Sequence, residues 1–142
     1  MDTNISISNR RIGVLINFIS LFLLIFVFEL INHDVGLGLT LGLILIGIFF
    51  VIVIASFIYV YGKTGLWKLS HQHIKLLDER QVQVLSNALR ISYSAFVIIV
   101  LIIIYGYALI KRGPIDVVIA GALIYMAHIL PASILAWTEK EV

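Results

Sequence analysis

The run VGLGLTLGLILIGIFFVIVIASFIYVY, residues 35–61, contains no charged side chain and consists mainly of Leu, Ile, Val, Phe and Gly. An α-helix needs about 20 consecutive apolar residues to cross the hydrocarbon core of a bilayer, which is about 30 Å thick. Because this run is longer than that minimum, it predicts a tilted membrane-spanning helix.

The composition of the whole chain agrees with this prediction. Of the 142 residues, 61% are hydrophobic and 13% are charged, and the mean hydropathy is +1.10. In a soluble domain about half of the residues are apolar and about a quarter are charged. A soluble fold of this size cannot hide so many Leu, Ile and Val side chains from water. We therefore predict an all-α integral membrane protein.

Three further apolar runs have the length of a membrane span, at residues 12–31, 91–110 and 115–137. Short polar segments separate the runs from one another. Together with residues 35–61 they predict a single domain, residues 1–142, built as a four-transmembrane-helix bundle. Residues 62–90, between the second and third spans, are called the elbow below.

The direction of the spans follows from the distribution of Lys and Arg, which are enriched in cytoplasmic loops. Eight of these residues lie before the first span, in the elbow or after the fourth span: Arg10, Arg11, Lys63, Lys68, Lys75, Arg80, Arg90 and Lys140. Only Lys111 and Arg112 lie on the opposite side. This excess predicts a bacterial cytoplasmic (inner) membrane protein with both termini, and the elbow, in the cytoplasm.

The elbow is predicted to be helical, because the chain has neither Pro nor Gly between Leu66 and Tyr105. We expect the third helix to begin near Leu69 and to continue unbroken into its span. At 100° per residue, one face of this helix is apolar, and it comprises Leu66, Ile74, Leu77, Val84, Ala88 and Ile91. The expected contacts with lipid headgroups or with a protein partner are Lys75, Asp78, Glu79, Arg80 and Arg90.

One short segment of the elbow resembles a sequence segment of other membrane proteins. The segment Leu77-Asp78-Glu79-Arg80-Gln81 resembles the L-D-E-R-Q segment of small, largely uncharacterised bacterial multi-span membrane proteins, in which it precedes a transmembrane helix. Here it precedes the span at 91–110. The resemblance implies the membrane class and carries no catalytic residue across, because those families have no established reaction.

The sequence excludes several kinds of chemistry. It has no Cys, so disulfides, thiolate metal sites and thiol catalysis are absent. It has no Gly-rich phosphate loop, no H-E-x-x-H and no G-x-S-x-G motif. His71 and His73 would point about 200° apart on a helix, whereas zinc needs three or four convergent ligands. We therefore expect no metal, no cofactor and no nucleic-acid partner, and a solvated face at these two histidines.

A candidate intramembrane polar site comprises His128, Tyr125 and Glu29. His128 falls near the middle of the fourth span, where polar side chains are costly and usually face the bundle or a wet cavity. Pro131 cannot donate a backbone hydrogen bond, so it leaves the carbonyl of Ala127 as an acceptor beside His128. Two readings remain open for His128: a hydrogen bond that joins helices, or a functional pocket.

A second candidate site lies at the outer ends of the spans. It comprises Glu29, His33, Asp34, Lys111, Arg112 and Asp116. Glu29 and His33 are four residues apart, so they would face each other if the first helix reaches His33. Ordinary pairing and snorkelling at the membrane interface would account for the same residues. In the second span, Gly38-x-x-x-Gly42 is the spacing that lets two helices approach closely.

Three function classes are compatible with these features. The one we favour is a non-enzymatic accessory, assembly or regulatory membrane subunit, because almost all of the chain lies in the predicted spans. Its partners would be the lipid bilayer and a membrane protein, or further copies of itself. The alternatives are a small oligomeric transporter or channel that uses Glu29 or His128, and a membrane enzyme acting on a lipid-soluble substrate.

Overall fold

The computed structural model describes residues 5–33, 36, 38–110 and 114–139. Every regular element in these residues is helical, which confirms the predicted all-α class. The elements are α1 (Ile7–Asn32), α2 (Leu39–Phe57), the π-helix η1 (Ile58–Gly62), α3 (Leu66–His71), the 3₁₀-helix η2 (Ile74–Leu76), α4 (Glu79–Ile110) and α5 (Val117–Thr138).

Four of these segments are long and apolar enough to cross a membrane: α1, α2 with η1, α4 and α5. Each contains most or all of one span predicted from the sequence. The helices form two compact units, residues 1–64 and 65–142, which are described separately. The single domain predicted for residues 1–142 therefore stays a prediction.

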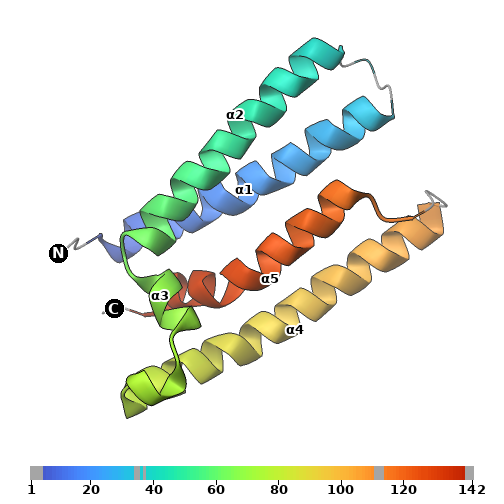
Figure 1. Cartoon of the computed structure of the whole chain (residues 1–142). Helices are drawn as coiled ribbons and strands as arrows, with labels where there is room; N and C mark the ends of the chain where they lie inside the picture. Colours follow the sequence, from blue (N-terminus) through green and yellow to red (C-terminus); the bar gives the residue numbers. More distant parts are fainter. Residues whose placement is uncertain (1–4, 34–35, 37, 111–113, 140–142) are drawn as a thin grey trace. The chain divides into compact units, whose positions relative to one another are not determined.

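In the first unit, α1 and α2 lie side by side as an antiparallel hairpin (Figure 1). The buried face of α1 includes Gly13, Val14, Asn17 and Leu21, which recur at helical spacing. Most of the large side chains that remain exposed on both helices are Ile, Leu and Phe. The outside of the hairpin is thus as apolar as its interior, as expected for helices surrounded by lipid.

Close packing of this hairpin depends on Gly13. A Cβ atom added there would collide with Cγ2 of Val60, which is fully buried in η1. Gly13 is therefore the glycine at which α1 meets the end of the second span. Of the predicted Gly38-x-x-x-Gly42 pair, Gly42 is buried in α2, whereas Gly38 is the N-cap and has open space around it. A close approach of another helix at Gly38 stays a prediction.

The second span ends in a π-helix. The amide of Lys63 donates to the carbonyl of Ile58 at 2.9 Å, a spacing of five residues instead of four. The hydroxyl of Thr64 donates to the carbonyl of Val60, which helps to satisfy the end of the helix. Single π-turns inside helices are uncommon and are frequent at functional sites. Gly65 follows with φ of +74°, a left-handed conformation that favours glycine.

The elbow is broken, contrary to the prediction of one unbroken helix from Leu69. Helix α3 ends at His71, and Gln72 and His73 are extended. Leu77 is also extended, and α4 begins only at Glu79. The predicted apolar stripe is not one helical face for the same reason: Leu66 and Ala88 are buried, whereas Ile74 is 66% exposed.

Side chains produce these breaks. The ring of His73 accepts a hydrogen bond from the amide of Lys75 at 3.3 Å and starts η2. Asp78 accepts from the amide of Gln81 at 2.7 Å, and the side chain of Gln81 accepts from the amide of Asp78 at 3.2 Å. This reciprocal pair has the arrangement of a capping box, which fixes the start of α4.

In the second unit, α4 and α5 lie side by side in opposite directions, and α3 contacts α5 (Figure 1). The buried residues of α4 are Leu85, Ala88 and Ser92, all in its first half. Helix α5 continues through Pro131, and its second half is largely buried. Within α5, Ala132 is buried, whereas Gly121 and His128 are exposed.

Candidate functional site

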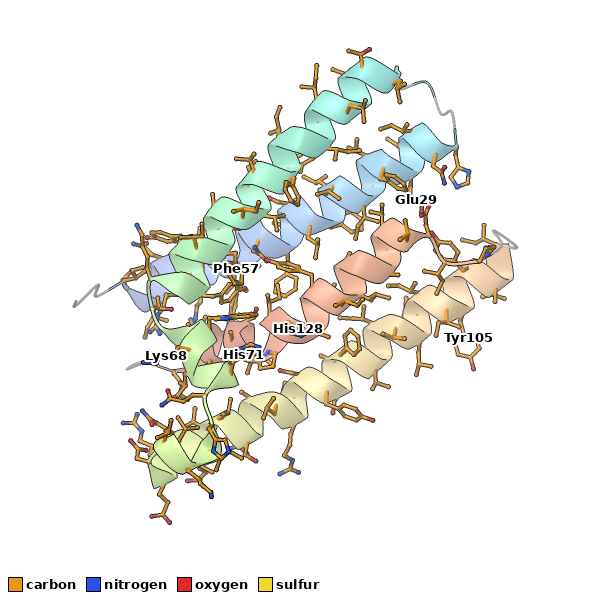
Figure 2. All side chains as sticks on the ribbon, in the orientation of Figure 1. Glu29, Phe57, Lys68, His71, Tyr105 and His128 are labelled. Carbon is orange, nitrogen blue, oxygen red and sulfur yellow. The ribbon has the colours of Figure 1, made fainter. Side chains whose placement is uncertain are left out.

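His128 on α5 faces His71 on α3 (Figure 2). Their ring centroids are 6.3 Å apart and their planes differ by 5°. His71 in turn stacks on Trp67, one turn earlier on α3, with a centroid separation of 3.9 Å and an angle of 29°. Three aromatic rings from the elbow and the last helix thus form one cluster, called the Trp67–His71–His128 cluster below.

Both imidazoles are oriented by hydrogen bonds at Nδ1. In His128, Nδ1 lies 2.8 Å from the carbonyl oxygen of Ile124. In His71, Nδ1 lies 3.0 Å from the carbonyl oxygen of Trp67 and 2.9 Å from Oγ of Ser70. A carbonyl oxygen can only accept, so the proton of each neutral ring belongs on Nδ1. Nε2 of each ring is then a lone-pair acceptor, the form in which imidazole binds protons or cations.

This cluster corrects the predicted depths of its members. The sequence placed His71 outside the membrane and His128 near the middle of the fourth span. Because α3 contacts α5 and the two rings are neighbours, both residues lie at one level along α5. The two depth assignments therefore cannot both hold. His71 is exposed as predicted, but it packs on Trp67 instead of lying on an open solvated face.

The other two members of the predicted intramembrane site do not form one described cluster with His128. Tyr125 is half-buried and lies three residues before His128 on α5. Glu29 lies near the end of α1, in the first unit (Figure 2). The assignment of these three residues to a single site stays a prediction.

The outer polar cluster is described in part. Nε2 of His33 lies 3.2 Å from Oε2 of Glu29, as expected for residues four apart, and His33 is the C-cap of α1. Asp116 is the N-cap of α5, and its carbonyl accepts the amide of Ala120 at 2.9 Å. The remaining members lie outside the described residues: Asp34, Lys111 and Arg112.

The predicted charged contacts of the elbow are all exposed: Lys75, Asp78, Glu79, Arg80 and Arg90. Asp78 has a local structural role as the capping residue of α4. Arg80 approaches Glu139, beyond the end of α5, with 4.0 Å between nitrogen and oxygen. An exposed pair at this distance contributes little to stability. These residues are thus available to a headgroup or a partner, and none of them forms a described cleft.

Two features of the first unit were not predicted as a site. The side-chain amide of Asn17 donates to Oγ of Ser56 at 2.9 Å and to the carbonyl of Val53 at 3.0 Å. Beside this pair a groove of about 560 Å³ runs between α1 and α2. The sequence feature that could have predicted this bond was the presence of Asn17 and Ser56 in apolar runs, where polar side chains form hydrogen bonds between helices.

Among the residues that the structure describes, no group of three or more His, Asp or Glu side chains is placed to hold a metal ion. Comparison of the chain with protein-family models, with curated proteins and with solved structures gave no match.

Proposed function

We propose that this chain is inserted in a bacterial cytoplasmic membrane, with both termini in the cytoplasm, and acts without catalysis as an accessory or regulatory subunit of a membrane protein. The four apolar helices and the uneven distribution of Lys and Arg support the membrane placement. The accessory role depends on one observation about α4.

That observation is the low burial of the second half of α4. No residue from Tyr93 to Ile110 is buried, although this part of the helix is strongly apolar. One stripe of it, at helical spacing, comprises Ile98, Ile102, Tyr105 and Leu109, and Leu109 is 82% exposed. Tyr105 points away from α5 (Figure 2). A helix of a membrane partner that packs on this stripe would cover it.

The length of α4 supports the same role. At 1.5 Å per residue, its 32 residues extend over about 48 Å, more than the hydrocarbon core of about 30 Å. If Tyr93–Ile110 spans the core, the first turns of α4 project into the cytoplasm and present Glu79, Arg80 and Arg90 there. One rigid helix would then contact a partner both inside the membrane and beside it.

Site-specific photocrosslinking in native membranes tests this proposal. A photoreactive amino acid at Ile102, on the exposed stripe, should crosslink to a discrete protein. At Ile103, which is half-buried, the crosslink should be intramolecular or absent. Crosslinking of Ile102 to lipid alone, together with purification of a monomer in mild detergent, would contradict the accessory role.

A small oligomeric transporter or channel is the second candidate, and the Trp67–His71–His128 cluster favours it. Two adjacent imidazoles with Nε2 as acceptor have the chemistry of a proton relay. In proteoliposomes, His71→Gln and His128→Gln would abolish pH-driven uptake while leaving folding intact. His73→Gln is the matched control, because His73 caps η2 and is not part of the cluster. Equal activity of all three variants would remove this candidate.

A further inference from the structure

The groove between α1 and α2 has two walls. Asn9, Ile12 and Ile16 of α1 form one wall, and Val51, Ala55 of α2 and Tyr59 of η1 form the other. These residues recur every three or four positions, so the groove runs along the helix axes for about 10 Å. Its volume of about 560 Å³ lies within the range of roughly 300–1,000 Å³ that is typical of small-molecule sites.

The two ends of the groove differ in polarity. Ile16 and Val51 at one end are apolar, whereas Asn9 and Tyr59 at the other supply polar groups. The second end is also cationic. Nζ of Lys63 lies 5.8 Å from the centroid of the Tyr59 ring. We call this polar end the mouth of the groove.

The groove is built by the two unusual features of this hairpin. Gly13 lies in its lining and has no side chain to fill it, and its contact with Val60 fixes the distance between α1 and η1. The π-turn of η1 carries both Val60, which is buried, and Tyr59, which is 38% exposed at the mouth. Ser56, also in the lining, is held by Asn17. The site is therefore fixed by packing within one unit.

We propose that this groove binds one anionic membrane lipid, with an acyl chain along Ile12, Ile16 and Val51 and its phosphate at Lys63. The inference depends on the proposed insertion in a membrane and not on the accessory role. The charge at the mouth selects the lipid class. An acyl chain gains nothing by moving from bilayer to groove, because its surroundings are apolar in both places. Preference must come from the headgroup.

The size of that preference follows from the one basic residue at the mouth. A Lys or Arg beside an anionic membrane surface contributes a factor of about five in affinity at ordinary salt. Lys63 therefore predicts about a fivefold preference for an anionic over a zwitterionic lipid with the same chains. The preference should decline at high salt, because exposed charges are screened.

Native mass spectrometry of the full chain in detergent tests the proposal, with phosphatidylglycerol and phosphatidylcholine of identical acyl chains as probes. The expected result is one saturable phosphatidylglycerol per chain. Lys63→Gln should lower its affinity about fivefold and leave phosphatidylcholine binding unchanged. Lys75→Gln, which removes an exposed charge far along the chain, is the matched control and should leave both unchanged.

A second variant tests the apolar part of the site. Ala55→Trp should fill the groove and abolish the saturable binding, whereas Ala108→Trp, on the exposed surface of α4, should preserve it. Circular dichroism of each variant monitors folding, and Lys63→Gln provides the test if Ala55→Trp does not fold. Equal effects of Lys63→Gln and Lys75→Gln, or unsaturable binding of both lipids, would overturn the proposal. Because no partner is present, a failure here would leave the accessory role standing.

Discussion

Asn17 and Ser56 join α1 to α2 by a side-chain hydrogen bond of 2.9 Å in the buried interior of the first unit. The same Asn17 amide reaches the carbonyl of Val53 at 3.0 Å, and the hydroxyl of Ser56 donates to the carbonyl of Ile52 at 2.8 Å. The side chain of Asn17 is fully buried. One amide thus links the two helices through both side-chain and backbone acceptors.

We expect Asn17→Ala to lower the free energy of unfolding by about 1–2 kcal/mol, because it removes these bonds and leaves a small cavity. Ser56→Ala should lower the free energy of unfolding by less than Asn17→Ala does. A double-mutant cycle between the two should give a coupling of about 0.6 kcal/mol, the average for such bonds in membrane proteins. Ser94→Ala is the control, since its hydroxyl bonds only to Arg90 of its own helix. Strictly additive effects would rule out the inter-helix bond.

Gly13→Ala should destabilise the first unit by about 1–3 kcal/mol, because the added methyl group overlaps Val60. The double variant Gly13→Ala with Val60→Ala should recover part of the loss by making room. Gly47→Ala, in open space within α2, should instead stabilise that helix by up to about 1 kcal/mol. Thermal unfolding of the three variants measures both the expected loss and the expected gain in stability. Equal effects of the substitutions at Gly13 and Gly47 would contradict the described packing.

Asp78→Ala should fray the first turn of α4, because the amide of Gln81 loses its 2.7 Å acceptor. Loss of such a cap corresponds to about fivefold faster exchange of the first amides of the helix. Hydrogen–deuterium exchange over residues 79–82 measures it. Gln83→Ala, at an exposed site beyond the cap, should leave the exchange unchanged. Unchanged exchange in Asp78→Ala would mean that α4 does not start there.

His71→Ala should expose one face of the Trp67 indole, since the imidazole now lies 3.9 Å from it. In a Trp137→Phe background, quenching of Trp67 fluorescence by acrylamide should increase. His128→Ala should have a smaller effect, because its ring contacts His71 and not Trp67 directly. His73→Ala should have none. Identical quenching in all variants would show that the three rings do not form a cluster.

The predicted orientation has its own test. A cytoplasmic reporter fused after Val142 should be active, and one inserted at His33 should report an external location. Both follow from the excess of Lys and Arg around the elbow and the termini. An external location for the C-terminal fusion would invert every cytoplasmic assignment.

The sequence predicts the four long helices because each is marked by an apolar run of membrane length, a signal that every residue of the run carries. The break in the elbow depends instead on single side chains. Asp78 and Gln81 have the spacing of a capping box, so this start of α4 was readable. His73 gave no such signal, since its ring acts as a cap only once its own backbone is extended.

Contacts between distant residues were not predictable from local pattern. Gly13 meets Val60 within the π-helix η1, and neither periodicity nor propensity marks the five residues of η1. His71 and His128 are separated by the whole of α4 in the sequence, and they approach because α3 contacts α5. The residues that line the groove between α1 and α2 could not be predicted for the same reason, since each of its walls is an ordinary stretch of an apolar helix.

The hairpin of α1 and α2 has a consequence for biogenesis. Its two helices follow each other directly in the chain, and the Asn17–Ser56 bond and the Gly13–Val60 contact both form within residues 1–64. Contacts between neighbouring helices close only short loops, so they form rapidly during synthesis. The hairpin of α1 and α2 should therefore pair before α4 is translated, with the Asn17–Ser56 bond already formed.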